Sequence, residues 1–313
     1  MMAKIATREA YGKALVELGS VNDKVVVLDA DLSKSTKTAD FSKQFPERFI
    51  NMGIAEANMM CVAAGMSTCG KIPFVSTFAM FAAGRAFEQV RNSICYPNLN
   101  VKICATHAGL TVGEDGASHQ AIEDLALMRA IPNMTVISPS DSIETEAVIK
   151  AIAEYNGPCY VRLGRVGVNV INDNADYKFE IGKGIELRKG TDVTIVATGI
   201  MVDEALAAEA ILKEEGISAN VINIHTLKPL DTDLLVKAAK TTKTIVTVEE
   251  HNIIGGLGSA VSEAICEVFP VPVIKVGVQD TFGESGQPAE LLKAYGLTPE
   301  KIVEAVKKAI SMK

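Results

Sequence analysis

The sequence predicts an α/β protein made of two three-layer α/β/α domains, each with a largely parallel sheet between two layers of helices. Short apolar runs alternate with segments of helical period along the whole chain, which is typical of parallel sheets with crossover helices. A polar, glycine-containing stretch at 164–189 interrupts that alternation. The 313 residues suffice for two domains that each bury a core. We therefore expect a first domain at 1–179 and a second at 180–313.

The first series of elements covers the chain up to the polar stretch. Apolar runs of strand length predict six strands, at 24–30, 48–52, 73–77, 101–106, 134–138 and 159–163. Helical periodicity predicts five helices, at 6–18, 55–67, 82–94, 119–130 and 140–155. Either Ser140 or Asp141 can serve as the N-cap of the last helix, because both side chains accept a hydrogen bond from the first turn.

The second series follows the same alternation after the polar stretch, which we interpret as a linker followed by an entry hairpin. Strands are expected at 192–198, 219–224, 244–249 and 271–276, and helices at 202–215, 232–239, 258–268, 289–295 and 299–310. Ligands of open parallel sheets bind beyond the carboxyl ends of the strands. The segments that follow the strands of the first domain are therefore where we expect a site.

Charge and composition exclude several classes of protein. The net charge of −7 argues against nucleic acid or an anionic membrane as the main partner. No apolar run approaches the roughly 20 residues that a membrane span needs, and the first 15 residues lack the apolar core of a secretory signal. The six cysteines form no Cys-x-x-Cys pair, which favours reduced thiols in a cytoplasmic protein.

Two segments after predicted strands carry candidate side chains. Glu56, in GIAEANM (53–59), begins a predicted helix; it either complements the helix dipole or is a buried carboxyl that exchanges a proton with a ligand. Phe78 and Phe81, in STFAMF (76–81), are three residues apart and form either ordinary core or an aromatic wall against a flat heterocycle.

The most informative segment is the loop THAGLTVGEDGASHQAIEDL (106–125), which is rich in glycine and in titratable groups. A long loop of this composition contributes little packing, so it predicts polar recognition or proton transfer. His107, Asp115 and His119 are competent metal ligands, but no i, i+4 histidine pair supports a metal site. After the next predicted strand, either Arg162 or Arg165 could grip an anion; a surface ion pair is the alternative.

Together these segments resemble the C-terminal half of transketolase, from about residue 6 to about residue 309. GIAEANM, STFAMF, VGEDGASHQ (112–120) and TVEEHNIIGGLGSAV (247–261) occur in the order found in that family. The resemblance implies the pyrimidine-binding domain of thiamine-diphosphate enzymes followed by the transketolase C-terminal domain. It also implies transfer of a two-carbon ketol unit from a ketose phosphate to an aldose phosphate in the non-oxidative pentose phosphate pathway.

The resemblance assigns expected roles to individual residues. Glu56 matches the catalytic glutamate that hydrogen-bonds the pyrimidine N1′ atom of the cofactor, and Ile54, Phe78 and Phe81 match residues that hold the aminopyrimidine ring. His119 and Asp115 match ligands of the donor hydroxyls, and His107 and Arg165 match ligands of the sugar phosphate; both histidines are also expected to be catalytic. Lys34 or Lys37 could replace a family arginine and serine that contact the acceptor phosphate. A third pocket aromatic is Gly84 here, and a family histidine is Ala57.

One family element is missing from the sequence. Complete transketolases bind the diphosphate and Mg²⁺ through a Gly-Asp-Gly motif followed by an asparagine, and GEDG at 113–116 is not that motif. We therefore expect an N-terminal transketolase subunit to supply this half of the site, in a heterotetramer of two copies of each chain.

Three rivals stay open. RFINMGIAEAN (48–58) and IPNMTVISPSD (131–141) fit a 1-deoxyxylulose-5-phosphate synthase-like protein almost as well. The β subunit of a 2-oxo-acid dehydrogenase is a separate chain of this size, but it should lack the paired His107 and His119. The third rival is a non-catalytic partner with a degenerate site, which the retained titratable residues disfavour.

Overall fold

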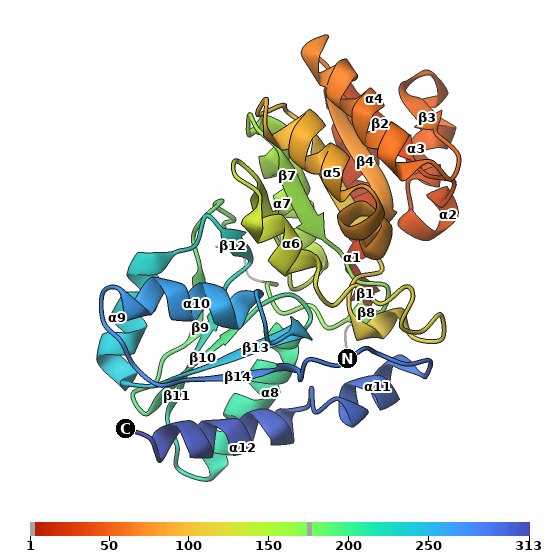
Figure 1. Cartoon of the computed structure of the whole chain (residues 1–313). Helices are drawn as coiled ribbons and strands as arrows, with labels where there is room; N and C mark the ends of the chain where they lie inside the picture. Colours follow the sequence, from red (N-terminus) through yellow and green to blue (C-terminus); the bar gives the residue numbers. More distant parts are fainter. Residues whose placement is uncertain (1–3, 174–176) are drawn as a thin grey trace.

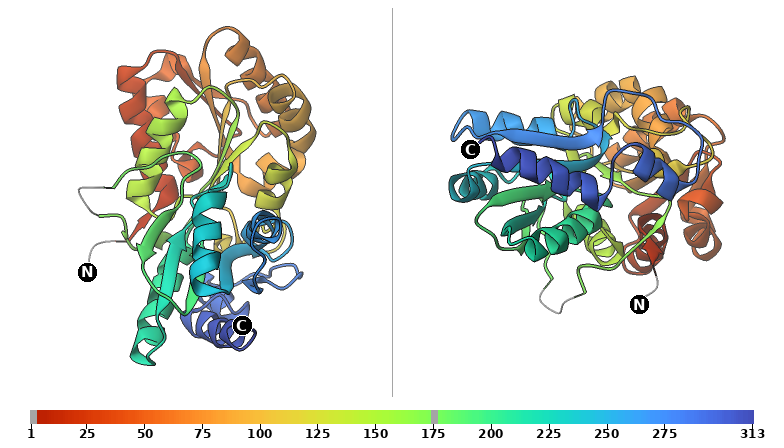
Figure 2. Two further views of the ribbon diagram at one scale, coloured as in Figure 1. Left: turned by 90° about the vertical axis from the view of Figure 1, so that its left-hand side faces the viewer. Right: turned by 90° about the horizontal axis from the view of Figure 1, so that it is seen from below.

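The structure is a computed structural model that describes residues 4–173 and 177–313. It contains two large sheets. The first is formed by segments coloured red to green in Figure 1 together with one teal edge strand, and the second by segments coloured green to blue. The views in Figure 2 show helices flanking both sheets. This architecture confirms the predicted fold class of two α/β domains with mostly parallel sheets. The predicted division at residues 179 and 180 stays a prediction.

The first sheet has seven strands in the order β12-β6-β7-β5-β4-β2-β3. All neighbours are parallel except β12 and β6, which pair antiparallel. The strands are β2 (Val25–Asp29), β3 (Phe49–Asn51), β4 (Ile72–Phe78), β5 (Lys102–Thr106), β6 (Thr135–Ile137), β7 (Cys159–Arg162) and β12 (Thr226–Lys228). Because β12 comes from the second half of the chain, the two halves share a sheet edge, which the sequence analysis did not predict.

Helices cover both faces of this sheet. The helical segments are α1 (Thr7–Val21), α2 (Ser33–Thr36), α3 (Ala39–Gln44), η1 (Pro46–Arg48), α4 (Glu56–Thr68), η2 (Phe81–Arg85), α5 (Phe87–Gln89), η3 (Val90–Cys95), η4 (Leu110–Val112), α6 (Asp124–Ala130) and α7 (Ser142–Glu154). Val25 and Val27 pack towards α1 and α7, whereas Val26 and Leu28 pack towards α4. Successive strand residues face opposite sides, so a strand covered on both faces is apolar throughout.

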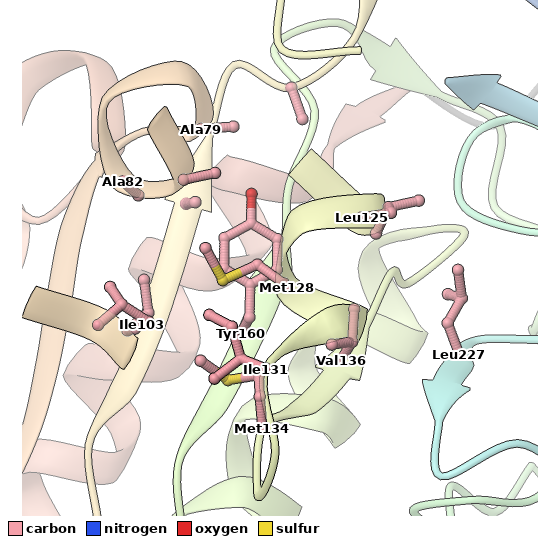
Figure 3. Packing of buried hydrophobic residues seen from close by; sticks show 14 of the residues in the cluster. Ala79, Ala82, Ile103, Leu125, Met128, Ile131, Met134, Val136, Tyr160 and Leu227 are labelled. Atoms are coloured by element: carbon pink, nitrogen blue, oxygen red, sulfur yellow. The ribbon is translucent and has the colours of Figure 1, made fainter. Parts of the chain in front are cut away.

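Figure 3 shows part of the core between the sheet and α6, where Ile103, Met128 and Tyr160 lie together. Leu227 of β12 belongs to the same cluster, as does Val196 of the second sheet. The apolar interior is therefore continuous between the two halves of the chain.

The second sheet has five strands in the order β14-β13-β10-β11-β9, with only β9 antiparallel. Its strands are β9 (Ile185–Arg188), β10 (Val193–Ala197), β11 (Ala219–Asn223), β13 (Ile245–Asn252) and β14 (Val273–Val278). Its helices are α8 (Met201–Glu214), α9 (Thr232–Thr242), α10 (Leu257–Cys266), α11 (Pro288–Ala294) and α12 (Pro299–Ile310). A short ribbon of β1 (Ile5–Ala6) and β8 (Gly167–Val168) ties the N-terminus to the segment after β7.

Three local predictions need correction or refinement. The expected helix at 82–94 is broken: η2 and η3 are π-helical turns, with Ala86 N–H donating to the Phe81 carbonyl five residues back. The expected helix at 119–130 starts only at Asp124. Of the two candidate caps of α7, the structure uses Asp141, whose side chain accepts the Glu144 N–H at 2.8 Å. In the part of the chain that the structure describes, no helix is long and apolar enough to cross a membrane.

Candidate active site at the carboxyl edge of the first sheet

Glu56 is the first residue of α4, directly after the turn that follows β3. Its carboxylate is almost completely buried, with 1% of the side chain exposed. The Nη1 atom of Arg85 donates to both carboxylate oxygens at 2.9 Å. The Arg85 side chain is 50% exposed, so the ion pair joins a buried acceptor to a donor that reaches in from solvent.

Four aromatic side chains gather beside this carboxylate; we call Phe78, Phe81, His107 and His119 the ring cluster. The rings of Phe78 and Phe81 are near-parallel with centroids 6.0 Å apart, and His107 stacks on Phe78 at 3.9 Å. His119 meets Phe81 edge-on at 5.3 Å. Phe78 ends β4, His107 follows β5, and His119 lies before α6. Adjacent parallel strands thus deliver all four side chains to one edge of the sheet, as the sequence analysis expected.

The π-helical turn η2 sets the position of Arg85 relative to the ring cluster. Arg85 follows Phe81 by four residues in this turn, and side chains four apart lie on the same side of a helix. The Arg85 guanidinium consequently lies over the Phe81 ring, with its central carbon 4.4 Å from the centroid. The sequence did not single out Arg85, because no local pattern marks the π turn.

Arg8 and Thr106 place polar groups against His107, a member of the ring cluster. Nη1 of Arg8 approaches His107 Nε2 at 3.5 Å, and Nδ1 of the same ring lies 2.9 Å from the Thr106 hydroxyl. Burial, together with the charges of Arg8 and Arg165, lowers the pKa of His107 to about 3. The imidazole is therefore neutral near pH 7, and the two arginines beside it carry the positive charge. The role of His107 as a ligand of the sugar phosphate stays a prediction.

Arg8 is a site residue that the sequence analysis missed. It donates to the Ser35 carbonyl at 2.8 Å, and its Nε atom is buried without a partner among the described residues. Burial lowers the pKa of its guanidinium. Lys37 forms an ion pair with Glu9 at 3.6 Å, and the role of Lys34 or Lys37 at the acceptor phosphate stays a prediction. Arg8 lies 99 residues from His107, so only the fold reveals their proximity.

The remaining predicted site residues differ in accessibility. Arg165 donates to the Val112 carbonyl and to Glu114 at 2.7 Å, which places it at the rim of the His107 loop. Asp115 is exposed in that loop, and Ile54 is 77% exposed next to α4. Within residues 4–173 and 177–313, no three His, Cys, Asp or Glu side chains gather as a metal site.

Arg162 is unavailable for binding an anion, although the sequence left it open as the alternative to Arg165. It is 7% exposed, and its Nε donates to both oxygens of the buried Asp124 carboxylate, at 3.0 and 3.1 Å. Its Nη2 donates to the carbonyls of Ala121 and Glu250, and Nη1 lies 3.9 Å from the Glu250 carboxylate. Because Glu250 belongs to β13, this network joins the two halves of the chain.

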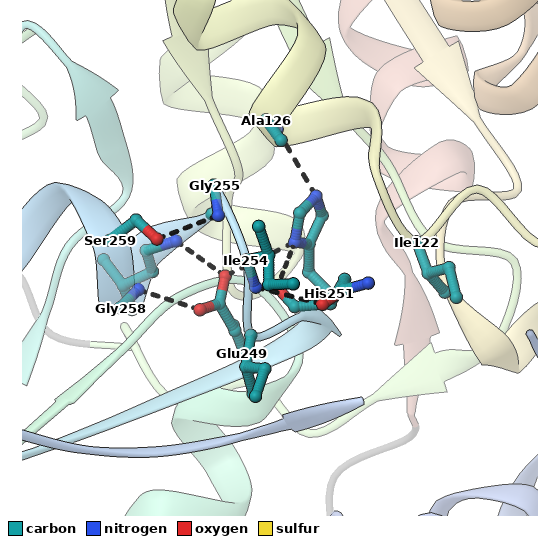
Figure 4. Close-up of polar contacts among 12 residues, drawn as sticks. Ile122, Ala126, Glu249, His251, Ile254, Gly255, Gly258 and Ser259 are labelled. Carbon is teal, nitrogen blue, oxygen red and sulfur yellow. Dashed lines mark hydrogen bonds and ion pairs between the residues drawn. The ribbon is translucent and has the colours of Figure 1, made fainter. Parts of the chain in front are cut away.

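The glycine segment of the second domain binds a carboxylate of the chain itself. Figure 4 shows Glu249 accepting hydrogen bonds from the first turn of α10, with the N–H of Leu257 at 2.6 Å and that of Gly258 at 2.8 Å. A Cβ atom on Gly256 would lie 2.0 Å from Glu249 Oε2. Burial raises the pKa of Glu249 to about 7. The segment is thus structural, because its N–H groups bind a buried carboxylate of the same chain.

Comparison with known proteins identifies the class to which this fold and site belong. The transketolase pyrimidine-binding domain family matches residues 3–169, and the transketolase C-terminal domain family matches residues 182–302. The chain belongs to the transketolase family, and its two domains are those of a transketolase C-terminal section.

Individual relatives agree with this assignment. A putative transketolase C-terminal section of Methanocaldococcus jannaschii is 54% identical, over 96% of this chain and 94% of that protein. A split-gene transketolase, solved as an inactive β4 tetramer, superposes with a TM-score of 0.91 and 61% identity, covering 99% of this chain and 100% of that one. Human transketolase is 41% identical over 98% of this chain and 49% of its own length.

Proposed function

We propose that this chain is the C-terminal subunit of a two-chain transketolase that transfers a two-carbon ketol unit from a ketose phosphate to an aldose phosphate. The observation that carries the proposal is the buried Glu56 carboxylate beside the ring cluster. The similarity to proteins described as a transketolase C-terminal section and as a split-gene transketolase supports it. The pathway that we propose is the non-oxidative pentose phosphate pathway, in the cytoplasm.

The residues fit the pyrimidine end of thiamine diphosphate. A flat, polar heterocycle needs an apolar surface to stack against and an acceptor at its edge, and Phe78, Phe81 and the Glu56 carboxylate offer both. When bound, thiamine diphosphate supplies the thiazolium carbon that breaks the ketose carbon–carbon bond. Glu56 holds a proton at the pyrimidine N1′ atom, and the exposed Ile54 borders the ring. Burial of Glu56 keeps water from competing for that hydrogen bond.

The sugar phosphate binds on the other side of the ring cluster. Arg165 and Arg8 attract the phosphate through their positive charges. Both guanidiniums lie near His107, because their charges contribute to the lowered pKa of its imidazole. The neutral His107 donates or accepts a hydrogen bond there. His119, which projects against Phe81, and the exposed Asp115 in the same loop bind the donor hydroxyls. In this arrangement the two histidines orient the carbon–carbon bond that is broken.

A separate N-terminal subunit binds the diphosphate and Mg²⁺. This chain corresponds to about half of full-length relatives such as human transketolase, and the similar split-gene protein is inactive as a β4 tetramer of one chain type. We propose a heterotetramer with two copies of each subunit, because two-fold symmetry is the simplest closed arrangement for two chain types.

One relative suggests a second donor. The 6-deoxy-6-sulfo-D-fructose transketolase subunit SqwH of a Clostridium species is 44% identical, over 95% of this chain and 92% of that protein. A sulfonate is an anion that Arg8 and Arg165 could also bind, so the assay should offer both donors.

The test is to purify the chain alone and with an N-terminal transketolase subunit from the same genome. Ketol transfer from xylulose 5-phosphate to ribose 5-phosphate is measured with thiamine diphosphate and Mg²⁺, and 6-deoxy-6-sulfo-D-fructose is the second donor. We expect activity only in the mixture. Activity of the lone chain would refute the two-chain proposal, and pyruvate decarboxylation without ketol transfer would favour the rival families.

A further inference from the structure

Arg85 contacts both groups that the aminopyrimidine is proposed to contact, the Glu56 carboxylate and the Phe81 ring. One of its nitrogens bridges the two oxygens of Glu56, and the central carbon of its guanidinium lies over the Phe81 ring, 4.4 Å from the centroid. A heterocycle that hydrogen-bonds Glu56 at its edge and stacks on Phe81 would meet the guanidinium in the same space. The two contacts of Arg85 and the two contacts of the heterocycle therefore compete.

The charges explain why Arg85 lies there. A carboxylate with 1% exposure is costly without a partner, and the described residues show hydrogen bonds to Glu56 side-chain oxygens from Arg85 only. Cation–π contact with Phe81 holds the guanidinium in line. Because half of the Arg85 side chain is in solvent, it can leave the carboxylate by side-chain rotation, without unfolding η2 or moving the backbone.

We propose that Arg85 is a displaceable counter-ion, which neutralises Glu56 until the aminopyrimidine takes its place. This inference rests on the proposed function and names Arg85 as a positioning residue that acts through Glu56. Binding of thiamine diphosphate exchanges the guanidinium for the heterocycle at Glu56 and at Phe81, and Arg85 moves into solvent. The free energy of the Arg85–Glu56 pair is thus subtracted from that of cofactor binding.

The decisive variant is Arg85→Met, which keeps an unbranched apolar side chain over Phe81 and removes the charge. Arg91→Met is the matched control, because Arg91 lies on the same segment and its side chain bonds only to Asn92 among the described residues. Thiamine diphosphate affinity is measured by isothermal titration of the two-chain complex with Mg²⁺. Thermal unfolding of the lone full-length chain provides an independent readout.

We expect Arg85→Met to bind thiamine diphosphate roughly tenfold more tightly than wild type. The reason is that wild type must first break a half-exposed ion pair, which changes a binding constant by about a factor of ten. The lone chain of this variant should melt at a lower temperature, and Glu56→Gln in the same chain should restore much of the loss. A merely structural Arg85 would give the lower melting temperature together with weaker binding.

Equal or weaker binding by Arg85→Met overturns the inference, whereas Arg91→Met should match wild type in both measurements. Binding by Arg85→Met alone, with none by wild type, supports the inference in its strongest form. If neither complex binds thiamine diphosphate, the proposed function fails and the inference fails with it. If wild type binds thiamine diphosphate and Arg85→Met binds it no more tightly, the inference fails while the proposed function stands.

Discussion

Two buried carboxylates, each on the first residue of a helix that flanks the first sheet, are paired with an arginine. The two pairs differ in how firmly the arginine is held. Asp124 pairs with Arg162, which is 7% exposed and also bonds two backbone carbonyls. Glu56 pairs with Arg85, which is 50% exposed and makes its hydrogen bonds to the carboxylate through one nitrogen. The Asp124–Arg162 pair is therefore a fixed joint between the two halves of the chain. The Glu56–Arg85 pair is a contact that a ligand can replace.

The difference follows from position in the fold. Arg162 is the last residue of β7, an inner strand of the first sheet, and its side chain bonds the Glu250 carbonyl of β13 and Asp124 at the start of α6. Arg85 lies on an irregular turn at the carboxyl edge of the sheet, where a ligand is expected. The lesson is that burial of a carboxylate alone does not mark a functional site; the freedom of its partner does.

The largest stability effect should come from breaking the fixed pair. Arg162→Met leaves the Asp124 carboxylate buried without its counter-ion, and the loss of one partner from a buried pair costs about 3–5 kcal/mol. Chemical denaturation of the lone chain measures the free energy of unfolding, with Arg91→Met as the exposed control. A loss below about 1 kcal/mol would show that this joint is no firmer than a surface pair.

The pH dependence of the free energy of unfolding tests whether His107, in the ring cluster, is buried and neutral. Burial and the neighbouring Arg8, Arg165 and His119 lower the pKa of His107 to about 3. Below about pH 6.5 the unfolded chain therefore binds a proton at His107 that the folded chain does not bind. This contribution to stability is complete above pH 6.5 and is lost as the pH falls towards 3. By linkage the loss at pH 4 reaches up to about 3 kcal/mol.

Denaturation of wild type and His107→Gln between pH 7 and pH 4 measures this contribution. The variant should lose less stability on acidification than wild type, because groups common to both chains cancel in the difference. Arg91→Met, which changes an exposed side chain, serves as the control and should follow wild type. Parallel pH profiles for wild type and His107→Gln would contradict a buried, neutral imidazole.

A smaller effect should come from the glycine segment beside the fixed joint. Gly256→Ala places a methyl group 2.0 Å from Glu249 Oε2, and overpacking of a tight interior costs about 1–3 kcal/mol. Gly65→Ala is the opposite case, because Gly65 lies within α4 with no atom within 4 Å of the added group; it should be neutral or stabilise by up to about 1 kcal/mol. Equal unfolding free energies for both variants would refute the packing argument.

The sequence predicted the fold well where the signal was local. Apolar runs such as the one around Val25 and Val27 are buried on both faces, which is why the parallel strands were recognisable. The edge strand β12 was missed because three residues carry no periodicity, and the π turns were missed because their helical pattern looks like that of an α-helix.

The site was predicted in part for the same reason. Glu56, Phe78, Phe81, His107 and His119 follow consecutive strands, so topology alone brings them to one edge. Arg8 and Arg85 were missed because their roles depend on contacts across the fold, with His107 and with Glu56. The sequence also left Arg162 and Arg165 as alternatives, since the depth of a side chain after a strand cannot be derived from alternation.

The most direct test of the account is the ketol-transfer rate of the two-chain mixture containing Glu56→Ala. The account predicts a rate reduced to background, because the proposed acceptor for the pyrimidine is lost. It also predicts normal thermal unfolding and normal assembly with the N-terminal subunit, because the half-exposed Arg85 can turn into solvent when its partner is removed. The wild-type mixture provides the reference rate. Substantial ketol transfer by the Glu56→Ala mixture would contradict the central claim that this chain supplies the carboxylate of a shared thiamine-diphosphate site.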